Sequence, residues 1–119
     1  MATTILATEA YRSKVAAAAA TGGSLPKAAE IAFGTGTTPP STEDIGLESE
    51  VHRQVLDSAE ADGMMLICKG VLQGEDSGDS RITETGVFAE DGTLMGRRVF
   101  KPKELEPESD LEFTLEFQY

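Results

Sequence analysis

His52 and Glu84 are the two side chains that we consider as candidates for a general acid or base. His52 is the only histidine, and Glu50 and Arg53 lie close to it in the chain. Imidazole and carboxyl groups transfer protons in many active sites, so a small enzyme that uses Glu84 and His52 is one hypothesis. A catalytic triad also needs a nucleophile at hydrogen-bond distance, which proximity in sequence does not provide. We therefore favour a histidine on a strand surface, and predict no catalytic residue and no cofactor.

Glu84 has a second interpretation, because it lies within an alternating, strand-like segment. On a strand at Ile82–Phe88 it shares a face with both end residues and with Gly86. If that face is buried, the carboxylate needs hydrogen-bond donors, either backbone N–H groups or Arg97 or Arg98 on the neighbouring strand. The glycine indicates a bulge or a close backbone contact. We favour a structural carboxylate over a catalytic acid.

The acidic segment Gln73–Ser80 is a candidate cation site. Its carboxylates are Glu75, Asp76 and Asp79. Their spacing lacks the alternate-residue pattern of a calcium loop, and the glycines and serines around them equally indicate a solvated loop. We predict a mobile loop and no metal site, and leave open whether this loop binds a cation.

Cys68 is the only cysteine, so no intrachain disulfide can form. It lies in the apolar run Met64–Cys68, which predicts a buried strand where a free thiol behaves as a small apolar side chain. A reactive thiol is the alternative, and it would need a nearby base. A single cysteine also fits a protein made in a reducing cytoplasm.

The glycines of Gly34-Thr35-Gly36 resemble the opening of a dinucleotide-binding loop. That site requires a third glycine and the N-terminus of a helix, whereas Pro39-Pro40 follows here. A flexible, exposed turn is the better interpretation, so we assign Gly34 and Gly36 structural roles.

Composition excludes several classes of partner. The chain has 119 residues and a formal net charge of -11, which suits a single domain over residues 1–119 and disfavours nucleic-acid binding. A short basic run is flanked by acidic residues and indicates local charge pairing; it consists of Arg97, Arg98, Lys101 and Lys103. The longest apolar run is too short for a membrane span, and the N-terminus does not resemble a secretory signal. We predict contact with neither nucleic acid nor membrane.

The elements that position these residues follow from periodicity and turn signals. Asp62-Gly63 and Asp91-Gly92 are hairpin signals, and the second makes both of its residues structural. The predicted elements are a helix at Thr8–Ala20, a strand at Ala28–Phe33, an exposed loop at Gly34–Pro40, a short helical or irregular piece at Thr42–Leu47, and strands at Val51–Ser58, Met64–Leu72, Ile82–Phe88, Thr93–Phe100 and Leu111–Phe117. We predict an α+β fold, with one N-terminal helix packed on a mainly antiparallel sheet of about five to six strands.

A series of short motifs extends over nearly the whole chain. In order, they are Ile5-Leu6 before a helix, the run Ile31–Gly36 before a proline-rich loop, Leu47, Glu50-Val51-His52-Arg53, then Ile82, Glu84, Gly86 and Phe88, then Glu90-Asp91-Gly92, Leu94, Phe100 and Pro102, and a last strand ending in Phe117. In this joint order the chain resembles the tail-fibre and tail-collar proteins of contractile-tailed bacteriophages and their prophage relatives.

The resemblance implies a non-enzymatic virion part near the baseplate that anchors or extends host-recognition fibres. It also implies other tail or baseplate proteins as partners, and a homo-oligomer, of which a trimer is the common form in such proteins. No repetitive shaft or receptor-binding tip follows here, which favours an adaptor or attachment domain. We expect contacts through the loop at Gly34–Ser41, the loop at Gln73–Ser80 and the exposed face of the last strand. A carbohydrate-binding β module is an alternative, although the chain has no Trp and only two Tyr for sugar stacking.

Overall fold

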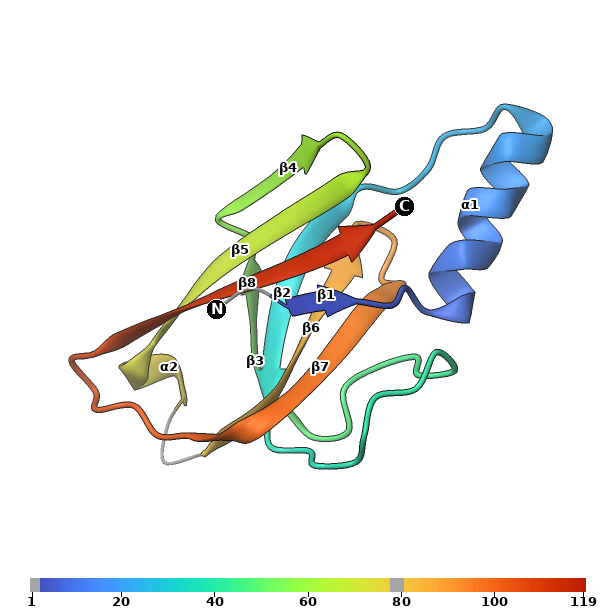
Figure 1. Ribbon diagram of the computed structural model, residues 1–119. Coiled ribbons are helices and arrows are strands. Elements are labelled where there is room, and N and C mark those ends of the chain that lie inside the picture. Colours follow the sequence, from blue (N-terminus) through green and yellow to red (C-terminus); the bar gives the residue numbers. More distant parts are fainter. Residues whose placement is uncertain (1–2, 78–80) are drawn as a thin grey trace.

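The computed structural model describes residues 3–77 and 81–119, and it consists mainly of two β-sheets packed face to face (Figure 1). Sheet A has the strand order β1-β8-β5-β4, and sheet B has the order β3-β2-β6-β7. The elements are β1 (Thr3–Ile5), α1 (Glu9–Thr21), β2 (Ala28–Gly34), β3 (Glu50–Val55), β4 (Ser58–Asp62), β5 (Met65–Gln73), α2 (Gly74–Ser77), β6 (Ile82–Ala89), β7 (Leu94–Lys103) and β8 (Asp110–Gln118). All strand pairs are antiparallel except β1 with β8.

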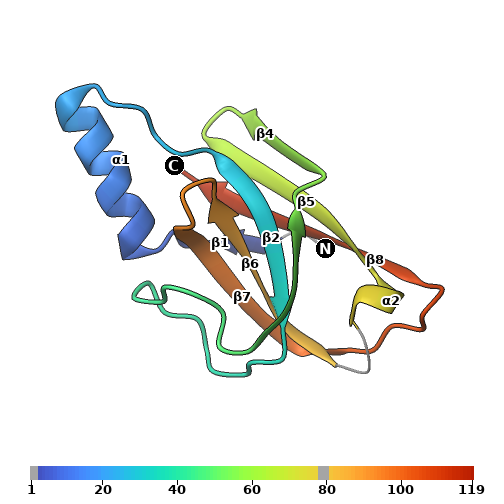
Figure 2. The same cartoon turned by 180° about the vertical axis from the view of Figure 1, so that it is seen from behind.

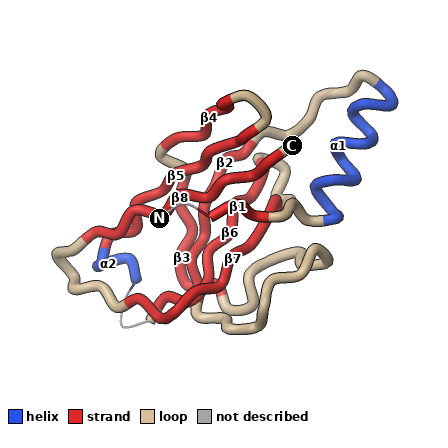
Figure 3. The backbone as a smooth tube through the Cα atoms, in the orientation of Figure 1, coloured by secondary structure: helices blue, strands red, loops and turns tan. Residues whose placement is uncertain are grey.

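The predicted α+β class and the mainly antiparallel pairing are confirmed. The described residues form eight strands in two sheets, which is more than the five to six expected for one sheet. As Figure 3 shows, the strands dominate and the longest irregular segment connects β2 to β3. Two packed sheets bury both inner faces, so a chain of this length can build a core with little helix.

Side chains from both sheets fill one apolar core. Ile31 and Phe33 of β2 are fully buried in it, together with Leu115 and Phe117 of β8. On β8, buried residues alternate with more exposed ones, the period-two pattern of a strand with one face in the core. A second, smaller apolar cluster lies in sheet B around Phe88.

The N-terminal helix α1 begins and ends at clear capping signals. Thr8 is the N-cap and its side chain accepts a hydrogen bond from the backbone N–H of Tyr11, while Gly22 closes the helix with φ 73°. Tyr11 is buried, and Val15 packs against the inter-sheet core. The remaining surface is largely exposed, and the helix stands at one side of the sandwich (Figure 1). Within the described ranges, no helix has the length and apolar character needed to cross a bilayer.

The strand predicted at Val51–Ser58 is confirmed over residues 51–55, but it is wrong as one continuous strand, because the chain changes sheets within it. β3 ends at Val55 and pairs with β2 in sheet B, whereas β4 pairs with β5 in sheet A. Two successive backbone N–H groups mark the crossing: that of Leu56 donates to Ala29 O (3.0 Å), and that of Asp57 donates to Lys69 O (2.9 Å). The predicted hairpin at Asp62-Gly63 therefore joins β4, not β3, to β5.

The mobile loop predicted at Gln73–Ser80 is also wrong over residues 74–77. These residues form the short helix α2, and its Gly74 and Ser77 are buried. The Gly74 N–H donates to Ser109 O (2.7 Å), and a Cβ on Gly74 would lie 1.8 Å from Glu106 O. The segment is thus packed against the β7–β8 connection. Asp79, the third predicted carboxylate, lies outside the described residues.

Candidate functional site

The most buried ionic group in the described chain is the carboxylate of Glu84, which is 0% exposed. Its Oε1 accepts hydrogen bonds from Arg97 Nε (2.8 Å) and the Glu48 N–H (2.9 Å). Its Oε2 accepts from the N–H groups of Gly36 and Ser49, both at 2.8 Å. Four donors occupy the acceptor positions of the two oxygens, so the carboxylate is fully satisfied and inaccessible to a substrate.

Arg97 extends this cluster toward the surface. Its guanidinium also donates from Nη1 to Asp44 (3.1 Å) and from Nη2 to the Thr38 carbonyl oxygen (2.8 Å), and its side chain is only 2% exposed. Glu84 and Arg97 come from the neighbouring strands β6 and β7, where Arg97 is paired with Gly86. We refer to the side chains of Glu84, Arg97 and Asp44, with the backbone groups that they bind, as the Glu84 network.

Glu84 and Gly86 lie on the face of sheet B that carries the second apolar cluster, together with Phe88. Ile82, which was predicted on this face, instead belongs to the inter-sheet core. The register of β6 against β7 shifts between Ile82 and Glu84, and that irregularity breaks the expected alternation. A Cβ on Gly86 would lie 2.9 Å from Leu47, so its small size admits the loop side chain.

No residue larger than glycine fits at position 34 or 36, because the carboxylate of Glu84 lies directly over both residues. A Cβ on Gly34 would lie 2.4 Å from Ser49 O and 2.6 Å from Glu84 Oε2, and one on Gly36 would lie 2.5 Å from the same Oε2. The Gly36 carbonyl oxygen also accepts from Thr83 Oγ1 at 2.6 Å. The two glycines thus permit close packing, and neither has a positive φ.

The Glu84 network holds the segment 35–49, which we call the 35–49 loop. Figure 2 shows this loop running from the ends of β2 and β3 along the base of sheet B toward the start of α1. There the Glu9 N–H, in the first turn of the helix, donates to Thr42 O (2.7 Å). Leu47 is packed against the second apolar cluster, whereas Ile45 is 82% exposed. Hydrogen bonds therefore hold this irregular loop at both ends and at its middle, while the large aliphatic side chain of Ile45 is exposed to solvent.

The electrostatics of Glu84 favour the charged form. Burial alone raises the pKa of the carboxyl group, but hydrogen bonds from Arg97 and from the N–H groups of Ser49, Glu48 and Gly36 outweigh it, and the net pKa is lowered. The Arg97 pKa is raised: burial opposes this change, and the hydrogen bonds to Glu84 and Asp44 exceed it. The pair is consequently ionised at neutral pH.

Asp91 and Gly92 form the turn between β6 and β7. Gly92 has φ 91°, which favours glycine, and the Thr93 N–H donates to Asp91 Oδ1 (3.0 Å). Asp91 also forms an ion pair with Lys14 of α1 (3.0 Å). Hydrogen bonds from the side chain and the N–H of Thr93, and then the contact with Lys14, lower the pKa of Asp91 to about 2.

We expect Asp91 to titrate well below an ordinary aspartate. NMR titration of its carboxyl carbon should give a midpoint near pH 2, against about 3.9 for an unperturbed aspartate. Because the folded pKa is the lower one, the contribution to stability is complete above about pH 4 and is lost as the pH falls toward 2. Thr93→Val should raise the midpoint more than Lys14→Met does. A midpoint near 4 in the native protein would contradict this.

His52 and Glu84 are not brought together. The His52 ring is stacked on Phe33, an inter-sheet core residue, with 6.4 Å between ring centroids, and its Nε2 lies 2.9 Å from Gln54 Oε1. The carboxylate of Glu84 packs against Gly34, the next residue of β2, which faces the other side of sheet B. The two groups therefore share no cleft, and the geometry gives the enzyme hypothesis no support.

The other chemical candidates also lack a reactive arrangement. Cys68 is 0% exposed, and burial raises its pKa to about 11, so very little thiolate exists at neutral pH. Within residues 3–77 and 81–119, no group of three or more acidic, histidine or cysteine residues is placed to hold a metal ion. Tyr119 is the one aromatic residue among the large exposed apolar side chains of these ranges, which offers little for sugar stacking.

Sequence reasoning missed most of the donors in the Glu84 network. It considered Arg97 and unspecified backbone N–H groups, but not the N–H groups of Glu48 and Ser49 or the role of Asp44. The available signal was the pair of glycines at 34 and 36 near a loop, together with a carboxylate on an otherwise apolar strand face. A buried carboxylate of this kind needs several donors, and a loop rich in free N–H groups can supply them.

The fold and this site describe a structural module, whose buried ionic cluster shapes a loop rather than lining an open cleft. Comparison with protein families gives a match over residues 1–111 to the family described as phage tail-collar fibre protein, N-terminal. The chain therefore belongs to the phage tail-collar fibre proteins, a family of structural proteins of bacteriophage tails. Comparison with curated proteins gave no match, and comparison with solved structures gave none either.

Proposed function

We propose that this protein is a baseplate-proximal attachment or adaptor domain of a contractile phage or prophage tail. It acts through protein–protein contacts and not through catalysis, most simply as a homo-oligomer that binds other tail or baseplate proteins. Family membership supports the tail assignment. The single structural observation that carries the proposal is the Glu84 network, which uses the only fully buried carboxylate in the described residues to hold a surface loop.

The 35–49 loop is the best candidate for the contact surface. Residues 37–41 at its start are exposed, and they include Pro39-Pro40. Ile45 is exposed over 82% of its surface although the residues around it are fixed by Glu9, Arg97 and Glu84. Binding to a loop that is already ordered avoids the entropic cost of ordering it, so an exposed aliphatic side chain on a fixed loop suits an anchor for a partner.

We also propose structural roles for the glycines and for the hairpin turn. Gly34, Gly36 and Gly86 allow the loop to approach sheet B, while Asp91 and Gly92 set the β6–β7 turn. The predicted contact surface at Gln73–Ser80 is less favourable over its described part, because Gly74 and Ser77 are buried. The outer face of β8, which carries Glu112 and Gln118, stays a second candidate.

The tail assignment is tested on purified particles. Phage-like particles induced from the source bacterium should contain this polypeptide when their proteins are identified by mass spectrometry. In a strain that lacks the gene, complementation with Ile45→Ser should lower incorporation at least about tenfold, as expected for an interface anchor. The matched control is Val55→Ser, at a residue of β3 that is 72% exposed, and this variant should not lower incorporation.

Two results would count against the proposal. Absence of the polypeptide from intact tails, despite its expression in the cell, would contradict the tail assignment. Equal incorporation of the Ile45→Ser and Val55→Ser proteins would instead remove the 35–49 loop as the contact surface.

A further inference from the structure

A groove lies between β7 and β8 where the two sheets are not bridged by β1. It has a volume of about 160 Å³ and is lined from β7 by Arg98, Phe100 and Lys103, and from β8 by Leu111, Glu112 and Phe113. The rings of Phe100 and Phe113 are 5.5 Å apart between centroids. The groove thus combines an apolar floor with two cationic side chains and one carboxylate, that of Glu112, which leaves its lining with a net positive charge.

The groove lies in line with β1, next to an earlier part of the same strand, β8. β1 pairs in parallel with β8 through Thr3–Ile5 opposite Leu115–Phe117, and it also contacts β7. On the side away from β5, the described residues pair with β8 only over those three positions, although β8 begins at Asp110. Figure 1 shows β1 beside the C-terminal part of β8 only. An unpaired strand edge next to an occupied one favours the addition of an extended segment.

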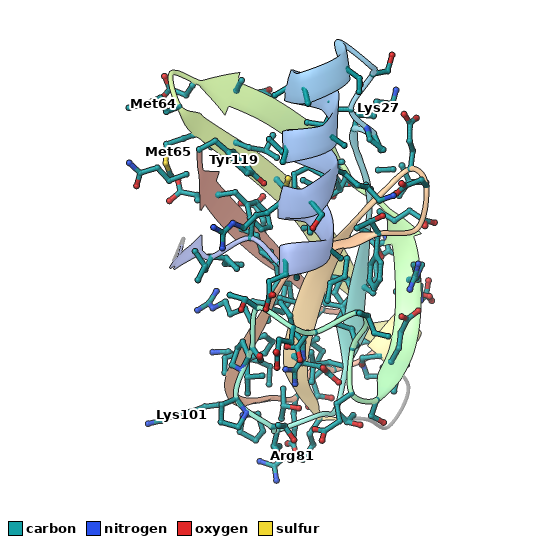
Figure 4. All side chains as sticks on the ribbon, turned by 90° about the vertical axis from the view of Figure 1, so that its right-hand side faces the viewer. Lys27, Met64, Met65, Arg81, Lys101 and Tyr119 are labelled. Atoms are coloured by element: carbon teal, nitrogen blue, oxygen red, sulfur yellow. The ribbon has the colours of Figure 1, made fainter. Side chains whose placement is uncertain are left out.

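The cationic side chains beside this groove form no ion pairs within the described part of the molecule. No ion pair in the described part of the chain involves Arg98, Lys101 or Lys103, whereas Arg97 on the same strand is bound by Glu84 and Asp44. The Arg98 guanidinium lies 5.6 Å from the Phe100 ring centroid. Figure 4 shows Lys101 projecting outward at the end of the molecule opposite Met64 and Lys27. In a chain of net charge -11, Arg98, Lys101 and Lys103 thus form a local cationic surface that no carboxylate of the described residues neutralises by an ion pair.

The geometry points to a binding site for an extended, acidic segment of a partner protein, which adds to β8 in line with β1, along the edge that the described residues leave unpaired. Its carboxylates would meet Arg98 and Lys103, and its apolar side chains would cover Phe100 and Phe113. Charge complementarity selects the occupant, because a neutral or basic segment would leave these cations unpaired. Pro102 lies in β7 and lacks an N–H group, so β8 is the better edge for pairing.

This inference rests on the proposed role in protein contacts, and it names the chemistry of one partner. The probe is a fluorescent peptide of about eight residues in which glutamate alternates with valine, a typical strand length. Fluorescence anisotropy should show that this peptide binds, while a peptide with lysine in place of glutamate does not. Binding of an acidic peptide to so acidic a protein would require a local cationic site.

Matched charge reversals locate the site. Arg98→Glu with Lys103→Glu should weaken binding of the acidic peptide at least about tenfold. Lys27→Glu with Lys69→Glu changes the net charge equally at exposed positions outside the groove, and should change binding less than about twofold. Lys103→Glu alone changes only an exposed residue, so a loss of binding in this variant cannot be due to misfolding. It should weaken binding at least about threefold.

Three results would overturn the inference. The first is equal binding of the acidic and basic peptides, and the second is equal effects of the two double variants. The third is the absence of peptide binding together with self-association that the Arg98→Glu, Lys103→Glu variant abolishes, which would assign the groove to a second copy of the chain. None of these bears on the tail assignment, which is measured on particles.

Discussion

Glu84→Ala should unfold at a temperature roughly 10–20 °C below the native protein. The substitution leaves the Arg97 charge buried without its main partner and three backbone N–H groups without an acceptor. Breaking a buried ion pair from one side costs about 3–5 kcal/mol, which gives that shift for a domain of this size. Glu60→Ala, at an exposed carboxylate on β4, is the control and should change the free energy of unfolding by less than about 0.5 kcal/mol.

Two further measurements distinguish the contribution of the Glu84 network from the loss of stability that any substitution in the core would cause. The double variant Glu84→Met, Arg97→Met should cost clearly less than the sum of the single substitutions, because no uncompensated charge remains. The folded pKa of Glu84 is lowered, so its contribution to stability is present above about pH 4.3 and is lost as the pH falls through the folded value. Glu84→Gln should therefore flatten the acid side of the stability profile. Additive single substitutions, or an unchanged profile, would contradict the assignment.

Gly34→Ala should destabilise the protein by about 1–3 kcal/mol, although it adds one methyl group. That methyl would lie 2.4 Å from the Ser49 carbonyl oxygen and 2.6 Å from Glu84 Oε2, so the backbone of the 35–49 loop must move away from β2. Movement of the loop would also lengthen the hydrogen bonds that Glu84 accepts from it. Urea denaturation followed by circular dichroism measures the loss.

The matched control for this substitution is Gly46→Ala in the same loop. A Cβ on Gly46 would meet nothing within 4 Å, and its φ is not positive. The change should be neutral, or stabilising by up to about 1 kcal/mol through the unfolded state. If Gly34→Ala and Gly46→Ala had equal effects, the close packing of the loop on β2 would not be a determinant of stability.

The order of elements could largely be predicted from the sequence, because local signals specify it. Helix α1 follows from the Thr8 cap and Gly22, and the β6–β7 hairpin follows from Asp91-Gly92. The change of sheet at Leu56-Asp57 could not be predicted. Alternation of apolar and polar residues indicates a strand but does not say which of two sheets it joins. The strand β1 was missed because three residues are too few to establish a period.

The candidate site could be predicted only in part. A carboxylate among apolar strand residues indicated that Glu84 needs donors, and this sequence pattern is local. The donors come from Gly36, Glu48 and Ser49, which are 48, 36 and 35 positions away in the chain. Backbone N–H groups are present in every residue except proline, so nothing in a single sequence distinguishes the three that bind the carboxylate.

The central claim is that Glu84 fixes the 35–49 loop as an ordered surface. Amide hydrogen exchange tests it directly, by comparing the N–H groups of Gly36, Glu48 and Ser49 in the native protein and in Glu84→Gln. We predict slow exchange at all three in the native protein and much faster exchange in the variant, with amides of β5 little changed. Rapid exchange at these three positions in the native protein, at the rate of an unstructured chain, would contradict the account.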